Sequence, residues 1–371
     1  AAAAAAMIAG GAVAATPSTT VIADGNDAVE KLANGTAYDS YTIVGAGAFG
    51  ALSVRNTTGQ TVKDVANLSF TNNTTSGKAG ALALDSASLK LTDAQFSNNS
   101  AAGFGGAVRL WGNTKGENQT HSALTLTTNR DLTYAGNKAG QGKTAEADGS
   151  TALGARYEDM GGFAHLQGNS TLTLTAARNT TLTIGETGAA QTAGLDSITT
   201  SNGGNTLVID GEGTVNLNGS LEGFVGTINV GATNVSGGTV NMATGFGSID
   251  NDAQYAVNNN TGKDKVSGAW VSDVQSVLKV QSGATVNMGA LTINRSTTSG
   301  AGTQLKVEDG GKLYVESITL GTKEYKDKAL GTTPDEKLAS GSLTTTGHGQ
   351  VDVAADAVAE VKKDVTVAAG T

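Results

Sequence analysis

The side chains that could perform acid–base or metal chemistry are scattered along this chain. Glycoside hydrolysis needs two carboxylates at a fixed separation, and a lyase needs acidic residues holding Ca²⁺ beside a basic residue. The acids of the regular segments stand alone, and they are Asp85, Asp93, Glu212 and Glu222. No ligand spacing relates the three histidines, which are His121, His165 and His348. We expect no catalytic residue and no metal site.

One glycine-rich stretch, from Gly45 to Gly50, matches the dinucleotide-binding pattern GxGxxG after a strand-like run. That interpretation requires a helix that begins at the last glycine. Residues 51–59 instead alternate with period two and reach a turn, which favours a glycine corner between strands. Cysteine is absent, which excludes disulfides and thiol nucleophiles. We therefore expect no cofactor.

The two tryptophans, Trp111 and Trp270, each lie beside a polar stretch. An exposed indole there could stack against a carbohydrate, whereas a buried one would close the protein interior beneath a loop. Because a lone tryptophan is usually mostly buried, the second interpretation is favoured. In the same way His165 takes the place of Arg109 in an internal repeat, so we expect it at an outward-facing strand position rather than in a metal site.

Composition limits the remaining functions. The 371 residues include 52 glycines and 2 prolines, with 4% aromatic and 15% charged residues, which are low values for a compact enzyme. Such a chain keeps its apolar residues for a narrow interior and exposes Thr, Asn and Ser. The net charge of −9 argues against nucleic acid and anionic membranes as partners, and mildly against acidic polysaccharides.

Two copies of one short pattern, 26 residues apart, indicate how the chain is built. The first contains Phe70, Asn73 and Gly80, and the second contains Phe96, Asn99, Gly105 and Gly106. A degraded third copy contains Tyr134, Asn137, Gly161 and Gly162. A unit of this length without helical periodicity cannot bury its apolar face alone, so it must stack on copies of itself.

The stacked object predicted by these repeats is all-β, a right-handed parallel β-helix. Strands of successive rungs would lie about 4.8 Å apart. Phe96 would then stack on Phe70 in the interior, and Asn99 on Asn73 in a ladder of side-chain amides. The glycines would mark corners that need a positive φ or a close backbone approach.

The FxxN and GGA(I/V/L) repeats resemble those of chlamydial-type polymorphic outer-membrane proteins and, more broadly, of autotransporter passenger domains. The sequences of residues 223–230 and 237–242 are similar to the strand repeats of autotransporter passengers. This resemblance implies a surface-exposed β-solenoid that is exported across a Gram-negative outer membrane through a C-terminal barrel. No barrel sequence is recognised in the chain, which would make it a passenger or part of one.

The chain divides into residues 1–40, an N-terminal extension and cap, and residues 41–371, the solenoid. A short capping helix is predicted between Gly25 and Gly35, with Asp27 and Glu30 as a capping box. Polar insertions are expected near 114–122, 141–160, 248–268 and 322–341. From Asn205 onward the strands become shorter and are separated by glycines.

We expect a non-enzymatic adhesin at the cell surface or in the extracellular space. Its partners would be itself, through cell–cell aggregation or biofilm formation, or ligands on host or neighbouring cells, with glycans among them. No segment long enough to span a membrane is found. Two alternatives stay open: a subunit that polymerises into an extracellular fibre, and a polysaccharide-processing β-helix enzyme.

Overall fold

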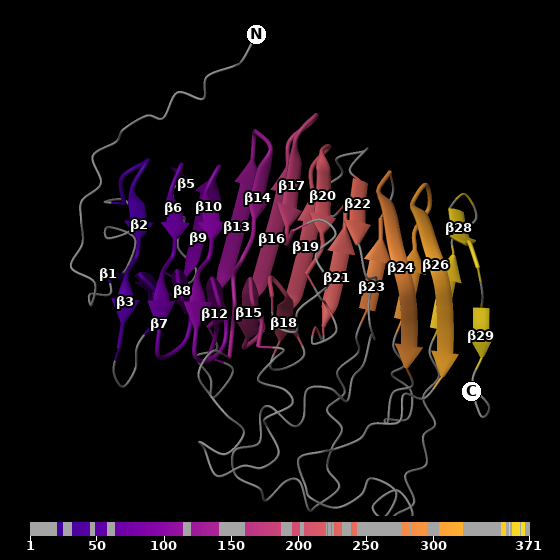
Figure 1. Ribbon diagram of the computed structural model, residues 1–371. Coiled ribbons are helices and arrows are strands. Elements are labelled where there is room, and N and C mark those ends of the chain that lie inside the picture. The colour runs from indigo at the N-terminus through magenta and orange to yellow at the C-terminus, as the bar shows by residue number, and fades with distance from the viewer. Residues whose placement is uncertain are drawn as a thin grey trace, which may run out of the picture.

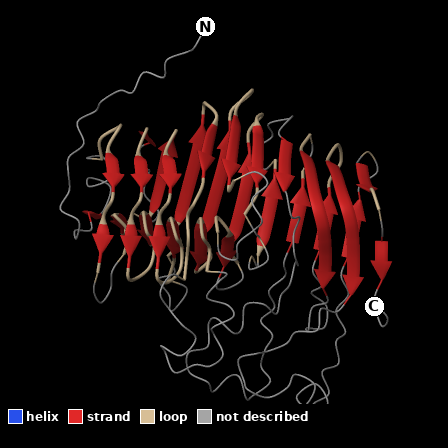
Figure 2. Cartoon of the chain, viewed as in Figure 1, coloured by secondary structure: helices blue, strands red, loops and turns tan. Residues whose placement is uncertain are grey.

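The computed structural model of this chain describes residues 21–24, 32–44, 49–57, 64–113, 120–140, 160–186, 195–200, 204–219, 221, 224, 226–231, 239–242, 277–281, 283–294, 304–321, 350–353, 356, 358–363 and 365–367. Within these residues all regular structure is β-strand, and no helix is present (Figure 2). The predicted all-β class is confirmed. The predicted cap helix falls mainly on residues 25–31, which lie outside the described residues.

The strands form five sheets in which neighbouring strands run parallel (Figure 1). Sheet A contains, in order, β1 (Val21–Asp24), β4 (Leu52–Arg55), β8 (Leu82–Asp85), β12 (Val108–Trp111), β15 (Ala164–Gln167) and β18 (Ile198–Thr200). Sheet B contains β2 (Ala37–Asp39), β6 (Ser69–Thr71) and β10 (Gln95–Ser97). Sheet C contains β3 (Thr42–Ile43), β7 (Thr74–Thr75) and β11 (Ser100–Ala101).

The two largest sheets run through the rest of the molecule. Sheet D contains, in order, β5 (Asp64–Ala66), β9 (Ser88–Thr92), β13 (Ala123–Thr128), β16 (Thr171–Ala176), β19 (Thr206–Asp210), β21 (Thr227–Val230), β23 (Val277–Val280), β25 (Gln304–Val307) and β27 (Gln350–Val353). Sheet E contains β14 (Leu132–Tyr134), β17 (Thr181–Ile184), β20 (Thr214–Leu217), β22 (Thr239–Met242), β24 (Thr285–Asn294), β26 (Lys312–Gly321) and β28 (Val358–Val361), and β29 (Val365–Val367) also pairs with β26.

The chain visits these sheets in a repeating order that becomes shorter along the sequence. From β4 to β11 it passes through sheets A, D, B and C and then returns to A. From β12 to β17 the cycle is A, D and E, β18 is the last strand of sheet A, and from β19 to β28 the chain alternates between D and E. This order, with parallel pairing throughout the sheets, is compatible with a β-solenoid whose turns simplify along the chain. The simplification coincides with the change in sequence near Asn205.

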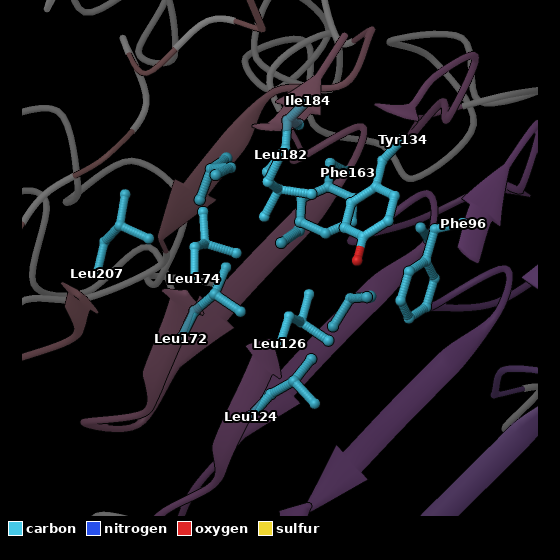
Figure 3. Packing of buried hydrophobic residues seen from close by; sticks show 14 of the residues in the cluster. Phe96, Leu124, Leu126, Tyr134, Phe163, Leu172, Leu174, Leu182, Ile184 and Leu207 are labelled. Atoms are coloured by element: carbon cyan, nitrogen blue, oxygen red, sulfur yellow. The ribbon is translucent and has the colours of Figure 1, made fainter. Parts of the chain in front are cut away.

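The interior is lined by every second residue of each strand. In sheet D, Leu89, Leu124 and Leu172 occupy equivalent positions of consecutive strands and are each at most 1% exposed. Figure 3 shows leucines of sheet D packing toward Leu182 and Ile184 of sheet E and toward the rings of Tyr134 and Phe163. Alternating apolar and polar residues place one face of each strand in this core.

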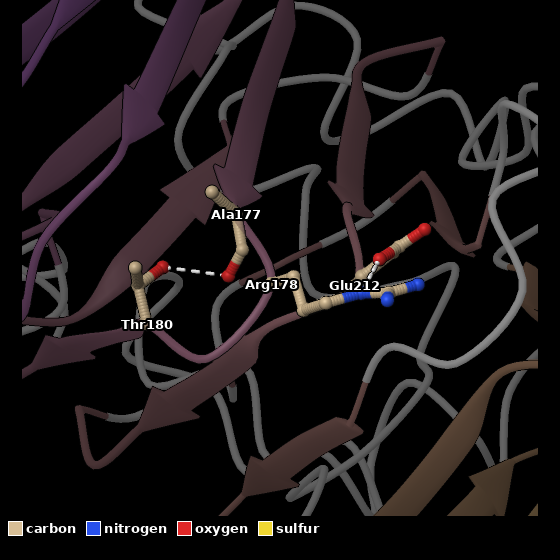
Figure 4. Close-up of polar contacts among 4 residues, drawn as sticks. All are labelled: Ala177, Arg178, Thr180 and Glu212. Atoms are coloured by element: carbon tan, nitrogen blue, oxygen red, sulfur yellow. Dashed lines mark hydrogen bonds and ion pairs between the residues drawn. The ribbon is translucent and has the colours of Figure 1, made fainter.

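A tight turn connects sheet D to sheet E after β16. The Thr180 hydroxyl donates a hydrogen bond to the carbonyl oxygen of Ala177 at 2.8 Å, and Asn179 adopts a φ of 61° (Figure 4). Arg178 projects from this turn and pairs with Glu212 of the next turn along the stack. Because the Arg178 side chain is 73% exposed, this ion pair contributes little to stability.

Two strands lie before residue 41, where we expect the solenoid to begin. β1 pairs with β4, and β2 pairs with β6, so the stack includes residues 21–24 and 37–39. The predicted insertions near 114–122, 141–160, 248–268 and 322–341 fall almost entirely outside the described residues, and so does Trp270, which lies beside one of them.

Candidate functional site

A ladder of aromatic rings runs through the interior beneath sheet B. Phe96 pairs in register with Phe70, and Phe70 with Tyr38. The ring centroids of Phe70 and Phe96 are 4.9 Å apart with planes 9° from parallel, and those of Tyr38 and Phe70 are also 4.9 Å apart. Tyr134 continues the series with its ring edge-on to Phe96 at 5.3 Å. The spacing of the rungs therefore sets the spacing of the rings.

A ladder of buried amides lies beside the rings. Asn73, Asn99 and Asn137 are each fully buried. The Asn73 Nδ2 donates to Asn99 Oδ1 at 2.9 Å, and the Asn99 Nδ2 donates to Asn137 Oδ1 at 3.0 Å. Each Oδ1 also accepts the backbone N–H of the preceding asparagine in the ladder, at 3.2 Å. The amides thus satisfy backbone groups that no strand pairs at this corner.

The amide ladder ends on a carboxylate that the sequence analysis missed. Asp196 is 1% exposed, and its Oδ1 accepts Nδ2 of Asn137 at 2.8 Å and the backbone N–H of Asn137 at 2.9 Å. Its Oδ2 accepts the backbone N–H of Gly136 at 2.9 Å. Burial raises the pKa of Asp196, while the hydrogen bonds from Asn137 and Gly136 oppose that rise.

The glycines of the repeat stand where no side chain fits. Gly105 and Gly161 have φ of 72° and 77°, in the left-handed region. A Cβ atom on Gly106 would lie 2.3 Å from the carbonyl oxygen of Gly162, and one on Gly80 would lie 2.3 Å from that of Gly106. Here the backbones of successive turns meet too closely for any larger residue.

The outward face of sheet A, where we expect His165, is covered by other parts of the chain. Five outward residues occupy equivalent positions of consecutive strands, and each is at most 6% exposed; they are Ser53, Ala83, Arg109, His165 and Thr199. The prediction that His165 faces away from the core agrees with the strand alternation, but the residue is 1% exposed. Its Nδ1 lies 2.8 Å from Thr199 Oγ1.

Aromatic rings from neighbouring corners provide part of this cover. The Phe104 ring stacks on the His165 imidazole at 4.3 Å. The Phe49 ring lies 5.7 Å from the Arg109 guanidinium and 6.0 Å from that of Arg55. Burial, with Arg109 and Lys78 nearby, lowers the pKa of His165 well below its usual value, so its imidazole is neutral at physiological pH.

A second outward column on sheet A borders the covered one. It consists of Arg55, Asp85, Trp111 and Gln167, which pair in register and are all half-buried. The Arg109 guanidinium lies 5.5 Å from the Trp111 ring. Burial lowers the pKa of Arg109 to about 10, opposed by the Asp85 carboxylate, so the guanidinium stays charged near neutral pH. We call one set of nine residues the sheet A cluster. It consists of the column Arg55, Asp85, Trp111 and Gln167 together with Phe49, Lys78, Phe104, Arg109 and His165.

The remaining candidates do not converge. After Gly50 the chain enters β4 rather than a helix, and Gly50 packs against the carbonyl oxygen of Ala81. His121 is exposed two residues before β13, while His348 and Glu222 lie outside the described residues. Within the described part of the chain, no three His, Asp or Glu side chains are placed to hold a metal ion. In that same part, no helix is long and apolar enough to cross a membrane.

Comparison with protein-family models, with curated proteins and with solved structures finds no match for this chain.

Proposed function

We propose that this chain is a right-handed parallel β-helix that acts as a surface-displayed, autotransporter-like passenger and adheres by associating with copies of itself. The handedness follows from general stereochemistry, because crossovers between parallel strands of one sheet are right-handed in about 98% of proteins. The FxxN repeats support the placement at the cell surface.

The observation that carries the adhesive function is the outward surface of sheet D. In β13, β16, β19 and β21 the outward positions are mostly threonine and half-buried, and one carboxylate, Asp210, lies at the end of β19. The threonines are Thr125, Thr127, Thr171, Thr173, Thr175, Thr206 and Thr227. Consecutive strands bring these hydroxyls into rows, for example Thr171, Thr206 and Thr227.

Rows of small hydroxyl side chains at the strand spacing suit contact with an identical surface. Each contact is weak, but a long stack sums many of them, as linked binding modules do. Between β13 and β21 the rows carry a single charged residue, Asp210, so little repulsion keeps two copies of this stretch apart. The row of Thr125 and Thr173 continues into Lys90 at one end and into Lys279 and Lys306 at the other, so the contact surface is limited to β13–β21. Sheet D is preferred over sheet E because it contains the most strands of the five sheets.

The proposal is tested with the double variant T173K/T227K, which places two ammonium groups in the sheet D rows without placing them opposite each other. We expect the parent protein to pair side by side in electron micrographs over a concentration series and to aggregate displaying cells. Molecules of the variant should remain unpaired in the micrographs, and cells that display it should not aggregate. T133K/T214K, which changes two outward threonines of sheet E, should behave as the parent does.

A strict monomer at high concentration, together with no aggregation of displaying cells, would refute self-association. Continuous filaments one stack thick would instead support the fibre alternative, and turnover of a polysaccharide would support the enzyme alternative. Far-ultraviolet circular dichroism of both double variants shows whether their β-structure is retained.

A further inference from the structure

One outward column of sheet D carries charge only toward its two ends. The column takes one residue from each of the nine strands, and these residues pair in register along the stack. We call it the central column, and in strand order it contains Asp64, Lys90, Thr125, Thr173, Val208, Asn229, Lys279, Lys306 and Asp352. Its middle, from β13 to β21, is uncharged.

The charged side chains of the central column are free to meet a partner molecule. Asp64 and Lys90 are exposed, and Lys279 and Lys306 are half-buried. No ion pair between described residues involves any of these four side chains. The order of their charges along the column therefore limits how a second copy can lie against sheet D.

One symmetric alignment has both stacks running in the same direction. In a two-fold dimer of this kind, each residue of the central column faces the same residue of the other copy. Lys90, Lys279 and Lys306 would each oppose an identical charge. Because like charges directly opposite each other repel, the central column disfavours this alignment.

Stacks that run in opposite directions can avoid this repulsion. With the two-fold axis at β16, Thr173 faces its own copy. Asp64 then faces Lys279, because β5 and β23 lie three strands before and three strands after β16. Lys90 faces the uncharged Asn229. The symmetry produces two ion pairs, and no like charges meet.

Other positions of the axis are less favourable. An axis between β16 and β19 places Lys90 opposite Lys279, and an axis at β19 places Lys90 opposite Lys306. An axis between β13 and β16 places Lys90 opposite Val208 and forms no ion pair. An axis between β19 and β21 pairs Lys90 with Asp352, but it covers Lys279 and Lys306 with threonines. Covering an unpaired ammonium removes its water without a carboxylate in return.

From this charge pattern we infer that two copies of the chain pair through sheet D in opposite directions, about a two-fold axis at β16, with Asp64 of each copy beside Lys279 of the other. The inference rests on the proposed self-association and specifies its geometry. Ion pairs at the rim of an interface add little affinity, but they select the alignment of the partners. The axis strand suits this role, because its outward residues Thr171, Thr173 and Thr175 are all uncharged.

Distances between spin labels test the alignment. The chain contains no cysteine, so the single variants A66C and K306C each accept one nitroxide label. Pulsed electron paramagnetic resonance measures the distance between the two labels of a dimer. With the axis at β16, the labels at residue 306 lie eight strand spacings apart and those at residue 66 lie six apart, about 38 and about 29 Å along the stack.

The other alignments give different pairs of distances. Stacks that run in the same direction bring both pairs of labels into contact. An axis between β16 and β19 makes the two distances equal, and an axis between β19 and β21 makes the distance at residue 66 the longer one.

Charge reversal gives a second test, by analytical ultracentrifugation. D64K should weaken dimerisation about tenfold, because two ion pairs become two contacts between like charges. D64K/K279D should restore the affinity of the parent. The matched control is D309K, since Asp309 is exposed after β25 and lies beyond the strands that overlap. We expect D309K to dimerise as the parent does.

The outcomes separate this inference from self-association itself. A parent that stays monomeric at high concentration in light scattering would overturn both. Dimers with label distances that are equal, reversed in order or in the contact range would overturn the alignment alone. Failure of D64K/K279D to recover the affinity lost in D64K, while D309K dimerises normally, would also overturn the alignment alone.

Discussion

At the scale of single residues, the amides of the corner beside sheet B replace missing strand pairing. Asn99 accepts the backbone N–H of Asn73 and donates to the carbonyl oxygen of Phe70 at 3.0 Å. Both backbone groups belong to residues with no measurable exposure. An apolar substitution would leave the Asn73 N–H without its acceptor and would remove one of the donors to the Phe70 carbonyl oxygen, so the ladder supports stacking at this corner.

N99A should therefore lower the free energy of unfolding by about 3 kcal/mol, since each unpaired buried group costs about 1–3 kcal/mol. N216A is the control, because Asn216 is half-buried on the outward face of β20 and its Nδ2 bonds to Thr183 Oγ1 at 3.2 Å. We expect a loss below about 1 kcal/mol there. Urea denaturation measures both, and equal losses would contradict a special role for the ladder.

Asp196 makes the stability of this corner depend on pH. Because its pKa in the folded protein is raised above the unfolded value, the folded state holds the proton more tightly. The contribution of this group is then full below the unfolded pKa of about 3.9 and is lost as pH rises through the folded pKa.

D196N removes this titration. We expect the stability of the parent relative to D196N, measured by urea unfolding at several values between pH 4 and 7, to fall as pH rises. A relative stability that stays constant would show that the three hydrogen bonds from residues 136 and 137 balance the effect of burial on the pKa of Asp196, and one that increases with pH would show that they outweigh it.

At the scale of elements, the close approach of successive turns is decided by glycine. A Cβ atom added to Gly106 would lie 2.3 Å from the carbonyl oxygens of both Gly162 and Lys138. Because these are backbone atoms in paired segments, neither can move without breaking the stack. Gly35 differs, since it has a φ of 77° but no atom within 4 Å of an added Cβ.

These two glycines separate crowding from backbone strain. G106A should cost about 3 kcal/mol or more, as overpacking of a rigid interior does. G35A should cost only about 1–2 kcal/mol, which is the cost of a left-handed conformation for a residue with a Cβ. Thermal unfolding of the two variants compares them, and equal shifts in melting temperature would show that crowding is relieved elsewhere.

The first turns and their stacking could be predicted because two copies of one pattern lie 26 residues apart. Identical residues 26 positions apart, such as Phe70 and Phe96, must occupy the same place in successive turns. Asp196 could not be found in this way, because it follows Asn137 by 59 residues and because an aspartate stands there in place of the asparagine of the repeat. The burial of Arg109 was also hidden, because Phe49 reaches it from a different turn of the chain.

At the scale of the whole molecule, each turn of the stack contacts mainly the turns before and after it. β16 pairs with β13 and β19 in sheet D, and in sheet E β17 pairs with β14 and β20. In such a one-dimensional arrangement, the free energy of unfolding is approximately the sum of the intrinsic stabilities of the turns and the interaction energies between neighbouring turns. A substitution in one turn should therefore destabilise that turn and its neighbours and leave distant turns largely unchanged.

L174A tests this, since Leu174 is fully buried at the centre of β16. We expect a local loss of about 2–5 kcal/mol from the cavity. Hydrogen exchange should show the largest loss of amide protection in β13, β16 and β19, with little change in β4 and β26. Uniform loss across all strands would mean that the stack unfolds as one cooperative unit, because the interfaces between turns would then be stronger than the stability of any single turn.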